Sequence, residues 1–472
     1  MLRKWISCKS PVALLALLFI FIFMLPHLLR EGMFLDGLIY ASVSRNMALG
    51  IGSFWFPRNT EVVYRIFHEH PPLAFGIQSL FFRVFGDHLW VEKLYTALMA
   101  IGNLILVVLL AKKTFKTKNV EILFFPVLLL SITAIYTWSM RNNLLENTYS
   151  IFTLAAVLLM FPSGKKEVLR LLLAGLFLYL GMLTKGFVSL FPLVVPVLCF
   201  VVYRDRSFLA SIKQTTLLLA VFIGLMAATI ILIPDSAVMF SHWLDRQVVQ
   251  SINGERGSVN RFFILKRFVQ EILPALGVIV VLLLVNGKKG LLAIRKKSQY
   301  QQHALLFLLI GLSATLPLMI SPKQHDYYLI PALPFFVLAL TAFSYPLVAH
   351  LSEKLRGKRK IIAIVNSVLI VAIAVVMVFS VATKDQLFRD KQTILDVKKI
   401  HEYTGSNVHV LVKKELIHDY ILGAYLQRYY TITPQYTPDT PDWYITNEKT
   451  YQSESWSKID DNFIRYYLYK RN

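Results

Sequence analysis

The chain has 472 residues, of which 56% are hydrophobic, and a formal net charge of +22 at pH 7. So large an apolar share excludes a water-soluble protein, because many runs approach the ~20 residues that cross a bilayer. The positive charge would suit nucleic-acid binding, but the basic residues form short clusters between apolar runs, which favours membrane topology as their explanation. The two cysteines, Cys8 and Cys199, form neither a disulfide framework nor a metal-ligand pattern.

Apolar runs recur over the first 382 residues. The first run follows Arg3, Lys4 and Lys9 and resembles a signal peptide, but no small-x-small cleavage site follows, so we interpret it as an uncleaved anchor. Thr184-Lys185 is a brief polar pause that could break one long helix, although the length of the run favours two spans. We predict about eleven spans, near residues 11–29, 89–111, 120–138, 145–161, 167–183, 186–203, 214–233, 270–287, 303–320, 328–347 and 361–382.

Alternate connections between these spans are basic, and the positive-inside rule places them, with the N-terminus, in the cytoplasm. The basic connections contain K-K-T-F-K-T-K (112–118), G-K-K-E-V-L-R (164–170), R-D-R (204–206) with Lys213, K-K (288–289) with R-K-K (295–297), and K-L-R-G-K-R-K (354–360). The opposite connections, of which 30–88 and 234–269 are the longest, carry acids, histidines, isolated basic residues and tyrosines. Long loops with ionisable groups on one face predict a site at the outer membrane–water boundary.

Residues 31–50 are predicted to form a helix on the membrane surface, ended by Gly50 and Gly52. Asp36 lies near the start of this helix and has two interpretations. It can cap the helix N-terminus, which the spacing alone favours, or its carboxylate can remove a proton from an acceptor hydroxyl. A second helix is predicted over 72–86, where the preceding prolines suit a helix start and the apolar residues suit the bilayer surface.

The segment F-H-E-H-P-P (67–72) lies between these two helices. His70 precedes a proline and is therefore pushed to an extended conformation, in which His68 and His70 face one side and Glu69 faces the other. Two histidines are a weak metal signal, because a catalytic zinc ion typically takes three protein ligands.

Further ionisable residues fall on the same side of the membrane. Lys185, in L-T-K-G-F, either extends to the interface or is a fixed positive charge for an anionic substrate group. The others are Arg141, Glu146, His242, Asp245, Arg246, Arg256, Arg261, Lys323, His325, Asp326, Tyr327 and Tyr328. Cations suit phosphate binding, and carboxylates suit proton removal or metal binding, so this set fits a phosphate-bearing lipid with a sugar head group.

Four short motifs follow one another: Asp36 with Tyr40, E-H-P-P-L (69–73), L-T-K-G (183–186) and S-P-K-x-x-x-Y-Y-L-I-P (321–331). In this order, the chain resembles the GT-C superfamily of polyprenyl-phosphate-sugar-dependent glycosyltransferases, especially the bacterial aminoarabinose transferases of lipid A and the protein O-mannosyltransferases. The resemblance implies a polytopic α-helical membrane protein with a GT-C-like transmembrane catalytic domain over residues 1–382. Amphipathic periplasmic helices would lie in its first outer loop.

The tail is more polar and is predicted to be a small periplasmic α/β domain over residues 383–472. Helices are predicted over Gln386–Tyr403 and Ile417–Tyr429, and strands over 408–412, 443–446 and 463–469. This unit resembles the soluble C-terminal domain of some of these transferases. Its aromatic residues suit a hydrophobic core.

The resemblance implies an inverting transfer of a sugar from polyprenyl phosphate to an acceptor lipid, glycan or protein, at the periplasmic face of a bacterial inner membrane. Asp36 would be the general base, and Lys185 would neutralise the leaving phosphate. The residues that would bind the donor phosphate and substrate are Tyr40, Glu69, His70, Lys185, Arg256, Lys323 and Tyr328. No cofactor is expected with certainty, and a divalent cation bridging Glu69, His70 and the phosphate is a minority hypothesis.

The chain also departs from the lipid A transferases, which carry D-E-x-R-Y where this sequence has D-G-L-I-Y. Gly37 and Ile39 replace the Glu and the Arg, His70 stands in place of a Lys, and Phe187 in place of a Pro. The missing arginine removes a planar donor suited to phosphate or carboxylate. Its charge could come from Arg141, Arg246 or Arg256.

Two other functions fit parts of the pattern. A transporter or flippase of lipid-linked sugars would carry charged or broken helices at mid-membrane, often in repeated halves, whereas here the ionisable groups gather on one face. An oligosaccharide polymerase or ligase would use a similar lipid-linked donor. No nucleic-acid partner is expected.

Overall fold

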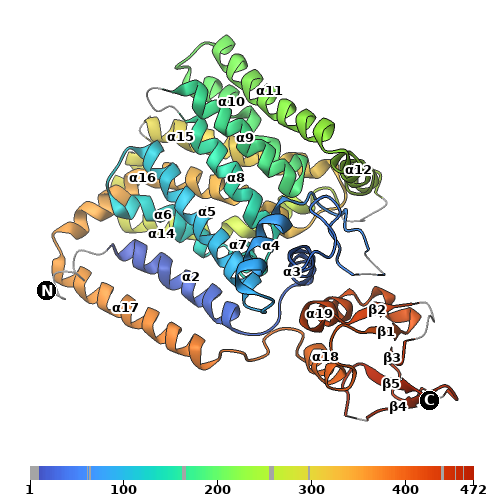
Figure 1. Cartoon of the computed structure of the whole chain (residues 1–472). Coiled ribbons are helices and arrows are strands. Elements are labelled where there is room, and N and C mark those ends of the chain that lie inside the picture. Colours follow the sequence, from blue (N-terminus) through green and yellow to red (C-terminus); the bar gives the residue numbers. More distant parts are fainter. Residues whose placement is uncertain are drawn as a thin grey trace.

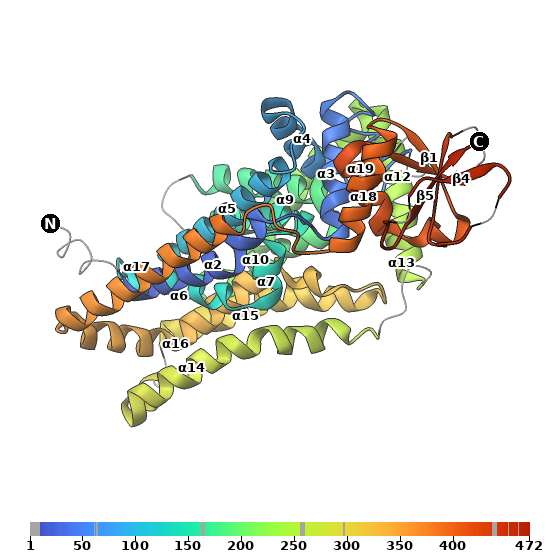
Figure 2. The ribbon, with the colours of Figure 1, turned by 90° about the horizontal axis from the view of Figure 1, so that it is seen from below.

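The computed structural model describes residues 10–60, 62, 65–161, 166–254, 260–295, 298–436, 441–451, 453–460 and 462–472. Long helices form a bundle, and a small α/β unit lies against one end of it, beside helix α3 (Figures 1 and 2). The helices before this unit are α2 (Pro11–Leu29), α3 (Leu35–Ala48), α4 (Leu73–Phe85), α5 (Val91–Phe115), α6 (Val120–Ser131), α7 (Ala134–Ser139), α8 (Leu145–Met160), α9 (Glu167–Lys185), η1 (Phe187–Val194), α10 (Val195–Tyr203), α11 (Phe208–Leu232), α12 (Pro234–Trp243), η2 (Leu244–Val249), α13 (Gln250–Ile252), α14 (Phe263–Arg295), α15 (Gln299–Thr315), η3 (Leu316–Ile320), η4 (Asp326–Leu329), α16 (Leu333–Arg356) and α17 (Arg359–Ala382).

Within the described residues, eight helices are long and apolar enough to cross a membrane. They confirm the predicted polytopic helical class. Three of the predicted spans contain shorter helices instead. Residues 120–138 are divided between α6 and α7, residues 145–161 contain α8, and residues 186–203 consist of the 3₁₀ helix η1 followed by α10. Thr184-Lys185 ends α9, so the run 167–203 is two helices, and the count of about eleven spans stays a prediction.

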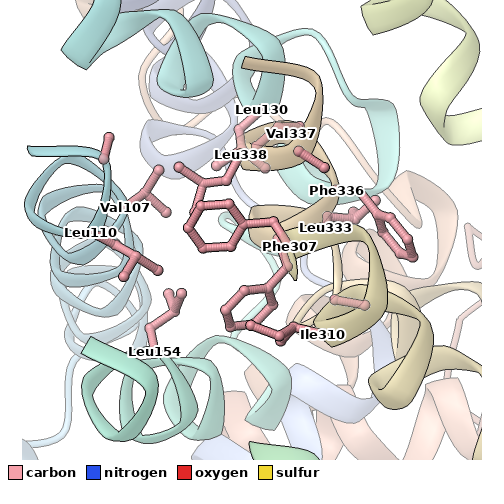
Figure 3. Close-up of a cluster of buried hydrophobic side chains, with 14 of the residues drawn as sticks. Val107, Leu110, Leu130, Leu154, Phe307, Ile310, Leu333, Phe336, Val337 and Leu338 are labelled. Carbon is pink, nitrogen blue, oxygen red and sulfur yellow. The ribbon is translucent and has the colours of Figure 1, made fainter. Parts of the chain in front are cut away.

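The bundle packs around helix α16. In the apolar stretch of α16, 61% of the residues are buried, whereas 11% are buried in the apolar stretch of α17. Helix α16 is therefore central and α17 is peripheral. A helix that is apolar all round is suited to such a central position. Figure 3 shows the core beside it, formed by Val107, Leu110, Leu130, Leu154, Phe307, Ile310, Leu333, Phe336, Val337 and Leu338.

Helix α3 corrects one expectation about the first outer loop. Ten of its residues are buried, and it lies between α4 and helix α19 of the α/β unit, so most of the helix is covered by protein. The N-cap is Phe34, so Asp36 stands in the first turn and does not cap the helix as the spacing suggested. Helix α4 does expose an apolar face, with Leu80 and Val84 among its exposed side chains.

The C-terminal α/β unit contains helices α18 (Lys391–Thr404), η5 (Lys414–His418) and α19 (Tyr420–Tyr430) and strands β1 (His409–Val412), β2 (Thr433–Gln435), β3 (Trp443–Thr446), β4 (Trp456–Lys458) and β5 (Tyr467–Arg471). The strand order is β2-β1-β3-β5-β4, with β2, β1 and β3 parallel and β5 antiparallel to β3 and β4. The strands predicted over 408–412 and 443–446 are confirmed. The last strand begins later than predicted, at Tyr467, and the short edge strands β2 and β4 were not predicted.

The core of this unit includes residues from the start of α3 and the segment before it. Met33 and Leu38 belong to the same buried cluster as Ile394, Val397 and Tyr425, and Leu35 and Ile39 pack against it. The division of the chain at residue 383 remains a prediction, but the unit is completed by residues around α3.

Gly37 provides a test of this packing. A Cβ at position 37 would lie 2.2 Å from the carbonyl oxygen of Asn142, which is backbone and cannot turn aside. Gly37→Ala should therefore lower the free energy of unfolding by about 1–3 kcal/mol, as overpacking does. The measurement is thermal unfolding in detergent. The matched control is Gly224→Ala, where a Cβ would meet no described atom within 4 Å; an equal effect of both substitutions would contradict the packing argument.

Candidate functional site

The first turn of α3 brings Asp36 against Tyr327. The Tyr327 hydroxyl donates a hydrogen bond of 3.1 Å to Oδ2 of Asp36. Tyr327 lies in the turn η4 and is 7% exposed. Burial and the neighbouring Asp36 charge raise the pKa of Tyr327 well above its ordinary value, so the phenol keeps its proton and remains a donor. One carboxylate oxygen of Asp36 is thus fixed in orientation.

Lys185 lies near the ring of the same tyrosine. Its Nζ is 5.8 Å from the ring centroid of Tyr327 and 5.2 Å from that of Tyr328. It forms an ion pair of 2.7 Å with Glu146, and the two side chains are 7% and 1% exposed. The structure therefore brings Asp36 and Lys185 together around one pair of tyrosines.

Near the start of a predicted span, Glu146 can be an acid that complements the dipole of its helix. It does stand in the first turn of α8, but it is also the partner of Lys185. The sequence alone does not distinguish an acid that complements its helix dipole from one that pairs with a lysine, because Lys185 lies on a different helix.

A cavity of about 430 Å³ opens beside this cluster. Its polar lining includes four of the predicted residues, His70, Lys185, Lys323 and Tyr328. The remainder is mainly apolar and comes from η1, α12 to α13, and the end of α15 with η3, for example Phe191, Trp243, Val248, Ile252 and Leu318. A cavity with a few cations among apolar walls suits a ligand that has an anionic group and a hydrocarbon chain.

Gln247 links further predicted residues to this cavity. Lys323 donates from Nζ to Oε1 of Gln247 at 2.8 Å, and Nε2 of Gln247 donates to the carboxylate of Glu69. The π-helical segment η2 places Gln247 there. The sequence did not indicate a role for Gln247, because a single glutamine in a predicted loop belongs to no recognisable motif. Tyr40, also predicted, contacts His70 with ring centroids 5.7 Å apart.

His68 and His70 do not act as the pair that their spacing suggested. His70 contacts Tyr40, whereas His68 stacks on His242 with ring centroids 5.1 Å apart. His68 is 6% exposed, and burial, His242 and Arg246 lower its pKa to about 4. His68 therefore packs between Phe56 and His242 of α12 as a neutral ring.

The arginine candidates lie in different surroundings. Arg141 donates to the carbonyl of Phe23 at 3.1 Å and does not line the cavity. Arg246 acts electrostatically on His68. Arg256 lies outside the described residues. Across the part of the chain that the structure describes, no group of three or more His, Cys, Asp or Glu side chains is arranged to hold a metal ion.

Comparison with known proteins shows what this chain is similar to. A family model described as dolichyl-phosphate-mannose-protein mannosyltransferase matches residues 69–231. The undecaprenyl phosphate-alpha-4-amino-4-deoxy-L-arabinose arabinosyl transferase of Photorhabdus laumondii subsp. laumondii is 25% identical over 206 residues, which are 42% of this chain and 36% of that relative. The chain thus spans about a third of the length of the curated relative that it matches.

Solved structures extend the likeness over the whole chain. ArnT from Cupriavidus metallidurans bound to undecaprenyl phosphate superposes with a TM-score of 0.67 at 15% identity, covering 96% of each chain. The apo state of the same protein gives 0.65 at 14% identity and covers 95% of each chain. The fold is therefore that of ArnT. Its particular resemblance is to the aminoarabinose transferases, so the resemblance inferred from the motifs is confirmed.

The buried His68 makes a pH prediction. Its pKa is about 4 in the folded protein against an ordinary value of 6.5. Between these values the unfolded chain binds the proton that the folded chain does not, so the free energy of unfolding falls as the pH falls from 6.5 toward 4. His68→Gln should therefore show a smaller drop of Tm between pH 7 and pH 5 than the wild type. Parallel Tm curves for the two proteins would contradict this assignment.

Proposed function

We propose that this chain is an inverting membrane glycosyltransferase that transfers a sugar from a polyprenyl phosphate, such as undecaprenyl phosphate, to a hydroxyl or phosphate acceptor on a lipid, glycan or protein. The observation that carries the proposal is the convergence of a carboxylate and a cation on one pair of tyrosines. Asp36 accepts from Tyr327, and Lys185 lies over the rings of Tyr327 and Tyr328, beside a largely apolar cavity.

The donor fits the cavity in two parts. The isoprenoid chain would lie along the apolar walls, and the phosphate would lie by Lys185, Lys323 and Tyr328. Undecaprenyl phosphate is the ligand named for the ArnT structure that has this fold, which supports a donor of this class. Lys323 is tied to Glu69 through Gln247, so the segment that carries Glu69 and His70 closes one wall of the same cavity.

The transfer then needs one bond to form and one to break. The acceptor oxygen attacks the anomeric carbon while the bond between that carbon and the phosphate oxygen breaks, and the phosphate leaves with the electron pair. Asp36 takes the proton of an acceptor hydroxyl, because a base must lie within hydrogen-bond reach of the group it deprotonates. Lys185 stabilises the negative charge that develops on the phosphate. Attack from the side opposite to the phosphate inverts the anomeric centre.

The charges at the two ends of the bundle support an orientation in the membrane. Helix α5 starts at the α/β unit, where Glu92 pairs with Arg428, and ends with Lys112 and Lys113 at the opposite end. The positive-inside rule puts the lysine end in the cytoplasm of a bacterial inner membrane. The cavity and the α/β unit would then face the periplasm.

The base assignment is tested by Asp36→Asn. The amide keeps an oxygen that can accept from Tyr327 but cannot take a proton at neutral pH, so turnover should fall by about 10²–10⁴ with the fold intact. The measurement is the acceptor-dependent release of polyprenyl phosphate by purified protein with a polyprenyl-phosphate sugar. Asp385→Asn is the matched control, because this carboxylate is 70% exposed and far along the chain from the cavity residues. Full turnover by Asp36→Asn would remove Asp36 from this role.

The same purified protein separates the alternatives. Movement of the intact donor between the leaflets of a vesicle, without release of polyprenyl phosphate, would indicate a flippase. Turnover only with a lipid-linked oligosaccharide would indicate a polymerase or ligase. Loss of turnover with a chelator, restored by a divalent cation, would favour the hypothesis in which Glu69, His70 and the phosphate share a metal ion.

A further inference from the structure

One buried hydroxyl group of the α/β unit forms hydrogen bonds with the chain shortly before Asp36. Tyr425 on α19 is fully buried, and its Oη accepts from the backbone N–H of Met33 at 3.2 Å. The same oxygen lies 3.2 Å from the carbonyl oxygen of Met33 and 3.0 Å from Oδ2 of Asp390, either of which can accept its single proton. Burial and the Asp390 charge raise the pKa of Tyr425, so this proton is retained.

A second contact joins α19 to the far part of α3. Arg45 of α3 is 1% exposed and donates from Nη1 to the carbonyl oxygen of Gln427 at 3.0 Å. Its Nη2 donates to Oδ1 of Asn46 at 2.9 Å. Tyr425 and Arg45 therefore fix α3 to the α/β unit on both sides of Asp36 and Tyr40.

A third contact joins α19 to the bundle itself. Arg428 is 1% exposed and donates to both carboxylate oxygens of Glu92, at 3.0 and 2.8 Å, and to Asp87 at 2.8 Å. Two carboxylates around one buried guanidinium satisfy its charge and give it a fixed geometry. Because Glu92 stands in the first turn of α5, the position of α19 is set by a membrane-spanning helix.

The bundle holds the start of α3 from the opposite side. Oδ1 of Asn142 accepts from the N–H of Phe34 at 3.1 Å, and Nδ2 of Asn143 donates to the carbonyl oxygen of Gly37 at 3.0 Å. Asp36 lies between these two anchored residues. Its location is therefore determined by the bundle on one side and by the α/β unit on the other.

We infer that Tyr425 is a positioning residue for Asp36, and that the α/β unit contributes to the reaction by holding the start of α3 against Tyr327. This inference rests on the proposed role of Asp36 as the base. Tyr425 itself does not touch the cavity, and it acts through the backbone of Met33. Since misplacement of a reacting group by about 1 Å can cost up to ~10²-fold in rate, a looser α3 should slow the chemical step without weakening donor binding.

The test is Tyr425→Phe, which removes one buried oxygen and keeps the ring. The matched control is Tyr466→Phe, since Tyr466 is buried in the same unit but its hydroxyl donates to Asp419 within that unit. We expect kcat to fall about 10-fold in Tyr425→Phe, with KM for the polyprenyl-phosphate sugar within about twofold of wild type. Backbone amide exchange over residues 31–38 should be faster in Tyr425→Phe than in Tyr466→Phe.

The outcomes separate this inference from the function on which it rests. If wild-type protein has no transferase activity, the proposed function fails and the inference with it. If the wild type is active, Asp36→Asn is inactive and Tyr425→Phe matches Tyr466→Phe in kcat and in exchange, only the inference fails. Should Tyr425→Phe not fold, Arg45→Lys tests the second contact: a lowered kcat at unchanged KM supports the inference, and wild-type kinetics overturn it.

Discussion

The ion pair between Lys185 and Glu146 is the interaction on which the site depends. Both side chains are more than nine-tenths buried, so each charge loses most of its hydration and is compensated by its partner at 2.7 Å. Removal of either group would leave a buried charge without compensation, which is far costlier than loss of an exposed pair. The pair also joins the end of α9 to the start of α8 at the cavity. A cation held in this way needs no reorganisation when negative charge develops on a neighbouring phosphate.

Around this pair, the site is assembled from segments that are far apart in the chain. Asp36 comes from α3, Glu146 from α8, Lys185 from α9 and Tyr327 from η4. Gly186 allows the close approach of one further wall: its φ is +86°, and a Cβ there would lie 2.1 Å from the ring of Trp243, which lines the cavity. The groups assigned to the site are therefore positioned by helix ends that meet at one end of the bundle.

The sequence predicted what depends on composition and local order. Apolar runs indicated the polytopic helical class, and the motif order indicated the resemblance to the aminoarabinose transferases. The motifs also contain four residues that line one cavity, His70, Lys185, Lys323 and Tyr328. The sequence did not show which side chains contact one another. Glu146 and Gln247 acquire their roles only because α8 meets α9 and η2 meets the loop before α4. Likewise, the spacing of His68 and His70 predicted that they face the same side. In the structure His68 contacts His242, whereas His70 contacts Tyr40. Periodicity describes one segment, whereas these contacts join two.

The departures at residues 37 and 39 have the same kind of explanation. Gly37 is needed because the carbonyl oxygen of Asn142 occupies the space that a side chain would take. Ile39, which stands where the lipid A transferases carry an arginine, packs against the hydrophobic core of the α/β unit. A guanidinium at that position would have to lose its hydration among apolar groups such as Leu38 and Ile394. At this turn of α3, Ile39 instead packs against the α/β unit. Under the proposed function, discrimination among acceptors would then come from other walls of the site.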